Sequence, residues 1–324
     1  MKILITGITG FFGKSLLRHI DILNSSSNEV IEVIGLSRNP EKFYFDHPGF
    51  ENKNWLSIKQ CDVLNPDQLN QNLNTDITDI IHLAVDSTIG PKMKNLQRFE
   101  QIYIGAKNIL DASIKFNIKN ILLASSGGVY GQARNANFNE SMPSILDLYA
   151  NKSTYSISKC LVEHIANLYA EEFGLNIKIA RCFSFVGQDL PLNSHYAIGN
   201  FINDAMFSKF IEVEGDGSAI RSYMHQEDLA NWLFCILING KPRSLYNVGS
   251  DFEISIKDLA FKVRDLLSKE KEVIFNNFVN TKSNRYVPDI SKANSELGLK
   301  ISYNLDEAIT KSASEILKSR MISL

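Results

Sequence analysis

Residues 3–13 read ILITGITGFFG, in which an apolar run meets three glycines spaced three residues apart. The apolar run predicts a buried strand, and the amphipathic residues that follow the last glycine predict a helix. In such a strand–turn–helix, Gly7 permits the tight turn, Gly10 lets the backbone approach a pyrophosphate, and Gly13 lets the helix pack on the strand. The stretch predicts a dinucleotide site. Its expected lining residues are Gly7, Gly10, Phe11, Phe12 and Gly13.

Short apolar runs alternate with amphipathic stretches over the first two-thirds of the chain. Strands are expected at 2–5, 29–36, 80–83, 120–124 and 176–180, and helices are expected to begin near residues 12, 66, 92, 155, 197 and 227. This alternation predicts an α/β fold of the Rossmann type, a doubly wound parallel sheet with a smaller interleaved C-terminal lobe. We expect a dinucleotide-binding domain over 1–185. Residues 186–324 are expected to form mainly a substrate-binding lobe, with some segments returning to the first domain.

The composition excludes several functional classes. The 324 residues carry a net charge of -2, which argues against nucleic acid as the main partner. The four cysteines form no CxxC pair and the six histidines are scattered, so neither a disulfide framework nor a metal site is expected. The start shows no signal peptide and no apolar run reaches the ~20 residues that cross a bilayer. We therefore expect a cytoplasmic protein without a membrane partner.

The end of the second expected strand bears on the choice of cofactor. Residues 35–39 read GLSRN, where an NAD site would carry an acidic residue for the adenosine ribose. Ser37 and Arg38 supply a hydroxyl and a guanidinium instead, which suit a 2′-phosphate by charge and by geometry. The pair favours NADP, and NAD stays possible with Arg38 as a plain surface residue.

A tyrosine and a lysine lie four residues apart in YSISK, residues 155–159, on an expected helix. Four residues make about one turn, so Tyr155 and Lys159 share a face. The ammonium of Lys159 would lower the pKa of the phenol, whose ordinary value near ~10 makes it a poor proton donor at neutral pH. By itself the spacing is common on helices.

Taken together, the residues resemble a known family. The pattern TGxxGxxG at 6–13, the strand end SSGGVYG at 125–131 and the YxxxK pair are similar to those of extended short-chain dehydrogenase/reductases of the NAD-dependent epimerase/dehydratase family. The resemblance implies a catalytic set of Ser126, Tyr155 and Lys159, with Ser126 bonding the reacting oxygen and Lys159 also holding the nicotinamide ribose. It implies further cofactor contacts at Asp62, Val63, Leu83, Ala84 and Val85.

The same resemblance implies a nucleoside-diphosphate sugar as substrate. Asn200, in SHYAIGNFI at 194–202, is similar to residues that contact the sugar and first phosphate. Arg221 and Arg285 resemble arginines that clamp the diphosphate, and two guanidiniums would supply local positive charge in a nearly neutral chain. For either arginine alone, a surface ion pair is an equally good interpretation.

Three reactions share this machinery. Family dehydratases carry Asp-Glu after the active hydroxyl, whereas this chain has Gly127 and Gly128, which have no side chain to move a proton. We expect an NADPH-dependent reductase of a nucleotide-linked 4-keto-6-deoxyhexose in surface-polysaccharide synthesis. The alternatives are an NDP-sugar 4-epimerase with tightly bound NAD and a non-catalytic dinucleotide sensor. Helices near 92–116 and 155–173 resemble those that pair in family dimers, which predicts a homodimer.

Overall fold

The computed structural model describes residues 1–85, 92–131, 137–276 and 284–322. The chain divides into two compact units by the contacts between its Cα atoms. The first unit comprises residues 1–131, 143–181 and 230–246, and the second comprises 132–142, 182–229 and 247–324. The chain therefore crosses between the units several times, and each unit has a buried core of its own.

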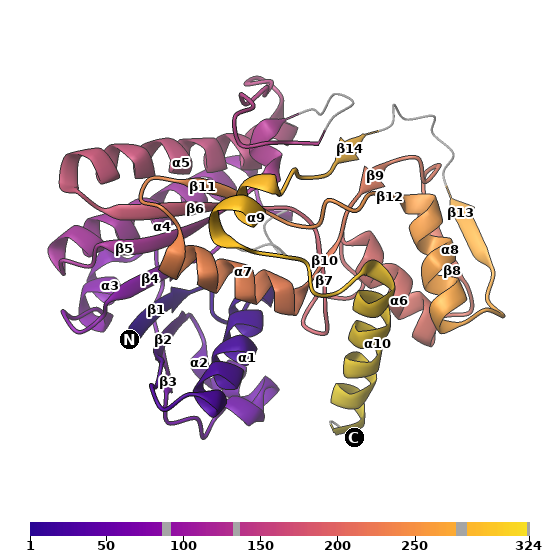
Figure 1. The fold of residues 1–324 in the computed structure, drawn as a ribbon, viewed down its shortest axis with the longest axis horizontal. Helices are drawn as coiled ribbons and strands as arrows, with labels where there is room; N and C mark the ends of the chain where they lie inside the picture. Colours follow the sequence, from indigo (N-terminus) through magenta and orange to yellow (C-terminus); the bar gives the residue numbers. More distant parts are fainter. Residues whose placement is uncertain (86–91, 132–136, 277–283, 323–324) are drawn as a thin grey trace. The chain divides into compact units, whose positions relative to one another are not determined.

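A seven-stranded sheet organises the first unit (Figure 1), in the order β11-β6-β5-β4-β1-β2-β3. Its strands are β1 Lys2–Thr6, β2 Glu32–Ser37, β3 Leu56–Gln60, β4 Asp79–His82, β5 Asn120–Ser126, β6 Asn176–Cys182 and β11 Leu245–Val248. Strand β1 pairs in parallel with both β2 and β4, so the order reverses direction at the centre of the sheet. The Rossmann-type parallel fold expected from the sequence is confirmed.

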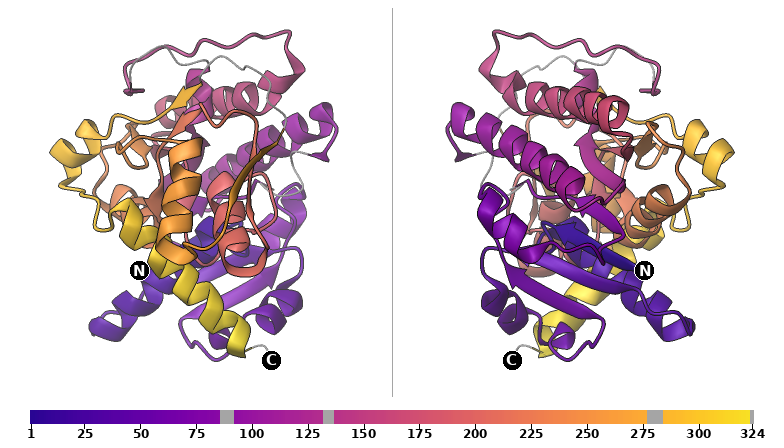
Figure 2. Two further views of the ribbon diagram at one scale, coloured as in Figure 1. Left: turned by 90° about the vertical axis from the view of Figure 1, so that its right-hand side faces the viewer. Right: turned by 90° about the vertical axis from the view of Figure 1, so that its left-hand side faces the viewer.

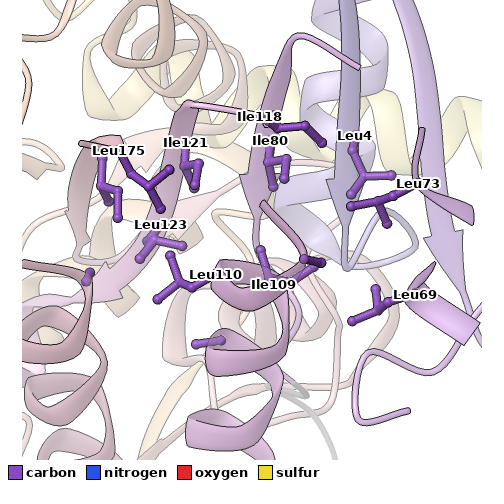
Figure 3. Close-up of a cluster of buried hydrophobic side chains, with 14 of the residues drawn as sticks. Leu4, Leu69, Leu73, Ile80, Ile109, Leu110, Ile118, Ile121, Leu123 and Leu175 are labelled. Carbon is purple, nitrogen blue, oxygen red and sulfur yellow. The ribbon is translucent and has the colours of Figure 1, made fainter. Parts of the chain in front are cut away.

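Helices cover both faces of this sheet because its strands are apolar on both sides. Along one face lie α3 Pro66–Asn72, α4 Asn95–Lys115 and α5 Thr154–Phe173. Leu4, Ile80, Ile121 and Leu123 point from the strands into a cluster with Leu110 and other side chains of these helices (Figure 3). The opposite face is covered by α1 Phe11–Ser26 and α7 Gln226–Asn239, where His19 contacts Phe234.

The strand and helix starts differ from the expected ones where side chains close a turn. β2 begins at Glu32 rather than residue 29, because the Asn24 amide donates to the Ile31 carbonyl at 3.0 Å and accepts from its N–H at 2.8 Å. The short helix α2 Pro40–Asp46 was not expected; Asn39 caps it through the Lys42 N–H, and proline occupies its first turn.

The second unit packs helices on small sheets. Its helices are α6 Ala197–Phe207, α8 Ile256–Leu267, α9 Ser291–Leu297 and α10 Leu305–Ile322. Its strands are β7 Phe185–Val186, β8 Ile211–Glu214, β9 Ile220–Arg221, β10 Met224–His225, β12 Ile254–Ser255, β13 Val273–Asn276 and β14 Arg285–Tyr286. Helix α8 packs against α6 and α10 and lies beside the β8–β13 pair, as Figure 2 shows.

Three chemical features follow from the described residues. The four cysteines are free. Among the residues that the structure describes, no cluster of histidine, cysteine and carboxylate side chains could hold a metal ion. None of the helices in the same ranges combines the length and the apolar character needed to span a membrane.

Candidate active site

The glycine turn brings β1 against the end of β4. Gly7 has φ +69°, and a Cβ there would lie 2.9 Å from the backbone of Leu83 and Ala84. Because the obstacle is backbone, a side chain at this position would force the two strand ends apart. Gly13 is equally confined, since its Cβ would lie 2.3 Å from the Ile8 carbonyl oxygen. The positive φ of Gly7 agrees with the tight turn expected there, and the confinement of Gly13 agrees with the expected packing of the helix on the strand.

Helix α1 begins at Phe11 directly after this turn. Gly10 is its N-cap and donates its N–H to the Gly7 carbonyl at 3.0 Å. The first turn carries no acidic residue, and the Phe11 and Phe12 rings lie 5.9 Å apart beside it. A helix N-terminus without a carboxylate attracts an anion through its dipole. The arrangement fits a dinucleotide pyrophosphate.

A hydroxyl that the motif analysis missed ties the turn to β4. Thr6 Oγ1 accepts the N–H groups of Leu83 at 3.1 Å and Ala84 at 3.2 Å, and lies 2.8 Å from His82 Nδ1. Burial, and secondarily the charge of Lys159, lowers the pKa of His82 to about 3. Thr6 stands inside the quoted glycine stretch, but its partners are about 76 residues away and give no local signal.

The ends of β2 and β3 hold the residues expected near the adenosine. Ser37 is buried and its hydroxyl accepts the Asn39 N–H at 3.1 Å, whereas Arg38 is exposed. After β3, the Asp62 carboxylate accepts the Leu64 N–H at 3.0 Å. The carbonyl of Val63 accepts from Asn108 at 3.0 Å. At the end of β2, Ser37 and Arg38 thus present a hydroxyl and a guanidinium, and neither residue is a carboxylate.

Ser126 lies at the last position of β5. Its hydroxyl accepts the Gly128 N–H at 3.1 Å and caps the 3-10 turn Gly127–Tyr130. The neighbouring Ser125 donates to Glu163 at 2.5 Å, and Glu163 pairs with the buried Arg181 at 2.6 Å. Ser125 is therefore part of a structural network. The catalytic role of Ser126 stays a prediction.

Tyr155 and Lys159 stand in the first turns of α5. Lys159 is only 4% exposed, and its ammonium donates to the Ala124 carbonyl of β5 at 2.7 Å. Tyr155 is half-buried and packs on the apolar cluster of Figure 3. The cation is therefore held at β5, the strand that ends in Ser126, and the three predicted catalytic residues belong to two neighbouring elements of one unit.

Gly128 has a second role that its type alone did not indicate. A Cβ at Gly128 would lie 2.9 Å from Ser156 Oγ and 3.3 Å from Ser126 Oγ. The Ser156 hydroxyl thus occupies the space above Gly128, next to the predicted catalytic serine. A carboxylate side chain at position 128 would have to displace it.

The two predicted phosphate-binding arginines lie on adjacent strands of the second unit. β9 and β14 run parallel, with Arg285 opposite Ile220 and Tyr286 opposite Arg221. The Arg221 guanidinium donates to the carbonyls of Ile220 at 2.8 Å and Asn284 at 2.7 Å. Arg285 pairs with Glu253 and donates to Asn137. The register therefore places the two arginines on adjacent strands but on opposite faces of the pair, and a shared diphosphate clamp stays a prediction.

Asn200 lies in α6 of the same unit. Its amide donates to the Ser194 carbonyl at 2.7 Å and accepts the Ser194 N–H at 3.1 Å. Both polar atoms therefore hold the preceding loop, so a ligand contact at this residue stays a prediction. In this structure the residue orders the segment where a sugar was expected.

Comparison with known proteins places the chain in a family. A model of the NAD dependent epimerase/dehydratase family matches residues 3–249, which is more than half of the chain. The chain belongs to this family. Among curated relatives, UDP-glucuronic acid decarboxylase 1 of Danio rerio is 27% identical over 315 residues, covering 96% of this chain and 71% of the relative. A probable dTDP-glucose 4,6-dehydratase of Sinorhizobium fredii is 28% identical over 353 residues, covering 98% and 93%.

Solved structures of family enzymes share the fold. A dTDP-glucose 4,6-dehydratase of Streptomyces venezuelae with NAD and TYD bound has a TM-score of 0.86 at 20% identity, covering 99% of this chain and 98% of that one. A UDP-glucose 4-epimerase of Thermotoga maritima with UDP-glucose has a TM-score of 0.84 at 18% identity, covering 99% and 100%. The family is thus established, and its members differ in the reaction they perform.

Proposed function

We propose that this chain is an NADPH-dependent reductase of a nucleotide-linked 4-keto-6-deoxyhexose, working in the cytoplasm in the synthesis of surface-polysaccharide sugars. The observation that carries the proposal is the side-chain set at the reacting end of β5 and α5. Ser126, Tyr155 and Lys159 can bond a carbonyl oxygen and deliver one proton to it, and Gly127 and Gly128 add no further acid or base.

The residues present fit a dinucleotide. Among the described residues, a Cβ at Gly10 would meet only the Gly7 carbonyl oxygen, at 3.3 Å, so the backbone at the N-terminus of α1 is open to the approach of a pyrophosphate. A bound nicotinamide would supply hydride transfer at C4 of the sugar. Ser126 would then orient the C4 oxygen and Tyr155 would donate its proton to it. Lys159, on α5 and buried against β5, would hold the ribose and favour the ionised phenol.

The end of β2 supports NADP over NAD. Several family structures contain NAD, and an NAD site uses a carboxylate for the ribose hydroxyls. This chain has Ser37 and the exposed Arg38 at that strand end, and a guanidinium suits a 2′-phosphate. Net reduction consumes a reduced cofactor in each turnover. A preference for NADPH therefore supports a reductase over an enzyme that keeps its cofactor.

Dehydration and decarboxylation are less well supported by the same residues. Removal of water from C6 needs an extra acid and base, and loss of a carboxylate leaves a carbanion at C5 that must take up a proton. Gly127 and Gly128 carry no such group, and Ser156 Oγ occupies the space above Gly128. A 4-epimerase needs only the Ser126, Tyr155 and Lys159 set, so it is the second candidate.

Purified protein tests the proposal directly. We expect NADPH to be oxidised in the presence of a dTDP-, GDP- or CDP-linked 4-keto-6-deoxyhexose, with NADH much less effective. Arg38→Ala is expected to weaken NADPH use about 10-fold and leave NADH use unchanged, whereas Lys42→Ala, on nearby α2, changes neither. Interconversion of UDP-glucose and UDP-galactose without added cofactor would instead establish the epimerase.

We also propose that two chains associate through α4 and α5. Ile104, Leu168 and Phe173 on these helices are 38%, 41% and 49% exposed, while Ala166 belongs to the core at 0%. Exposed apolar side chains along two adjacent helices favour a self-complementary contact. Light scattering of the purified protein is expected to give twice the chain mass, and Leu168→Glu is expected to give the monomer mass.

A further inference from the structure

An arginine of α4 stacks on the predicted proton donor. Helices α4 and α5 pack side by side along one face of the sheet (Figure 2). Arg98, in the first turns of α4, places its Cζ atom 4.6 Å from the centre of the Tyr155 ring. This distance lies within the range of cation–π attraction. The phenol is thus accompanied by a cation from a different helix as well as by Lys159 from its own.

The guanidinium of Arg98 is partly buried beside this ring. Its Nε is buried and has no hydrogen-bond partner among the residues that the structure describes, an unusual state for a buried N–H. Arg181 makes a useful contrast, since it stacks on Tyr130 at the same 4.6 Å but donates to Glu163 through Nε at 3.0 Å and Nη2 at 2.6 Å. Arg181 is neutralised by a carboxylate, whereas the contact described for Arg98 is the phenol ring.

We propose that Arg98 is a positioning residue for Tyr155, fixing the plane of its ring and stabilising the negative charge that the phenol carries once its proton has left. The inference rests on the proposed function, in which Tyr155 moves that proton. A planar guanidinium stacks flat on a ring and limits its rotation. Its attraction is stronger for a phenolate than for a neutral phenol, because the ring then carries a full charge.

The other titratable groups near Tyr155 fix the expected direction of the pH effect. Lys159 follows one turn later on α5, and its ammonium donates to the Ala124 carbonyl. His82 on β4 is neutral at physiological pH because burial lowers its pKa to about 3. Glu163 is neutralised by Arg181, and β5 contributes the uncharged Ser126. Removing Arg98 therefore leaves one cation and raises the pH at which Tyr155 loses its proton.

The experiment measures Tyr155 ionisation without any substrate. Near-ultraviolet absorbance is titrated for the full chain and for Tyr155→Phe, and the difference isolates the one phenol. The same two titrations, with Tyr155 present and with Tyr155→Phe, are repeated in the Arg98→Met and Arg98→Lys backgrounds. We expect the midpoint to rise by about 0.5–1 pH unit in Arg98→Met, with a smaller rise in Arg98→Lys, which keeps the charge but loses the planar stack. If the midpoint is unchanged in both variants, the proposal is overturned.

The pH dependence of kcat gives a second readout, and the direction of its shift can be predicted. In the reductive direction Tyr155 must hold its proton, so the basic limb of kcat moves to higher pH in Arg98→Met. In the oxidative direction Tyr155 must have lost its proton, so the acidic limb of the kcat–pH profile also moves to higher pH in Arg98→Met. At neutral pH the oxidative kcat is expected to fall about 3- to 10-fold with little change in KM. Arg264→Met, which removes a guanidinium stacked on Phe261 at 4.9 Å, is the control and moves neither limb.

The two proposals fail separately. If no nucleotide sugar is turned over by the unmodified chain, the proposed function fails, while the absorbance titration still tests Arg98. If turnover is found but both limbs stay in place in Arg98→Met and Arg98→Lys, the function stands and the role of Arg98 is refuted. Should Arg98→Met not fold, Arg98→Lys carries the same test.

Discussion

Thr6 and His82 join the ends of two neighbouring strands through a hydroxyl and an imidazole nitrogen 2.8 Å apart. Thr6 Oγ1 accepts the N–H groups of Leu83 and Ala84, so its own proton is donated to His82 Nδ1. The contact therefore selects a neutral imidazole with an unprotonated Nδ1. It also fixes the backbone segment against which Gly7 packs.

This neutral histidine predicts a loss of stability in acid. The unfolded chain protonates His82 near its ordinary value of 6.5, but burial holds the folded pKa at about 3. Between these two values the unfolded state binds more protons than the folded state. Each unit by which the pH is lowered in this range therefore reduces the free energy of unfolding by up to about 1.4 kcal/mol from this group. Urea denaturation from pH 7 to pH 4 is expected to show a shallower fall in His82→Asn. An equal fall in the free energy of unfolding in both proteins would contradict a neutral, buried His82.

Replacement of the phenol is expected to abolish proton transfer. Tyr155→Phe should lower kcat at least about 100-fold, since a positioned acid contributes 10²–10⁴-fold, while the Kd for the cofactor stays within about 2-fold. Steady-state kinetics and fluorescence titration with the reduced cofactor measure the two effects. Tyr169→Phe is the matched control, because Tyr169 also lies on α5 but donates to the exposed Asp111. Near-normal turnover in Tyr155→Phe would refute the catalytic role.

The space above Gly128 gives a prediction for a pair of variants. Gly128→Ala forces its Cβ against Ser156 Oγ at 2.9 Å and Ser126 Oγ at 3.3 Å, and is expected to lower kcat about 10- to 100-fold by displacing Ser126. Adding Ser156→Ala removes the first of these contacts and should recover part of the loss. A double-mutant cycle on kcat measures the coupling, and strictly additive effects would argue against the contact.

The ion pair of Arg285 predicts an effect on nucleotide affinity. Glu253 would compete with the proposed diphosphate for this guanidinium, so Glu253→Gln is expected to tighten binding of a nucleoside diphosphate about 2- to 5-fold. Arg285→Met is expected to weaken it at least about 10-fold. Calorimetric titration measures both. Asp306→Asn, which breaks the exposed pair with Lys262 in the same unit, is the control and should leave the Kd unchanged.

Local patterns predicted the elements at which a dinucleotide is proposed to bind. The glycine stretch, the strand ending in Ser126 and the YxxxK helix each combine an element with its functional residue, so their order and type could be read from neighbouring residues alone. Strand β3 was not among the expected strands. Helix α2 was missed because Pro40 and the Asn39 cap act over only a few residues between longer apolar runs.

Contacts between distant segments could not be predicted in the same way. Arg98 precedes Tyr155 by 57 positions, and nothing in the residues around it indicates a stack on that ring. The same holds for the bond from Thr6 to His82 and for the pairing of β9 with β14. Each depends on strand order and helix packing, which are properties of the whole fold. Ser156 was within the quoted motif, but its role became visible only with Gly128 beside it.

Gly13 carries a consequence for how this sequence tolerates change over time. A side chain at this position would collide with the Ile8 carbonyl, which belongs to the protein itself. The requirement for glycine therefore holds whether or not a coenzyme is bound. A homologue without catalytic activity would tolerate replacement of Tyr155, but a substitution at position 13 would still prevent it from folding. Survival in a saturation-mutagenesis screen scored by solubility alone should therefore exclude every residue but glycine there, while accepting most replacements of the phenol.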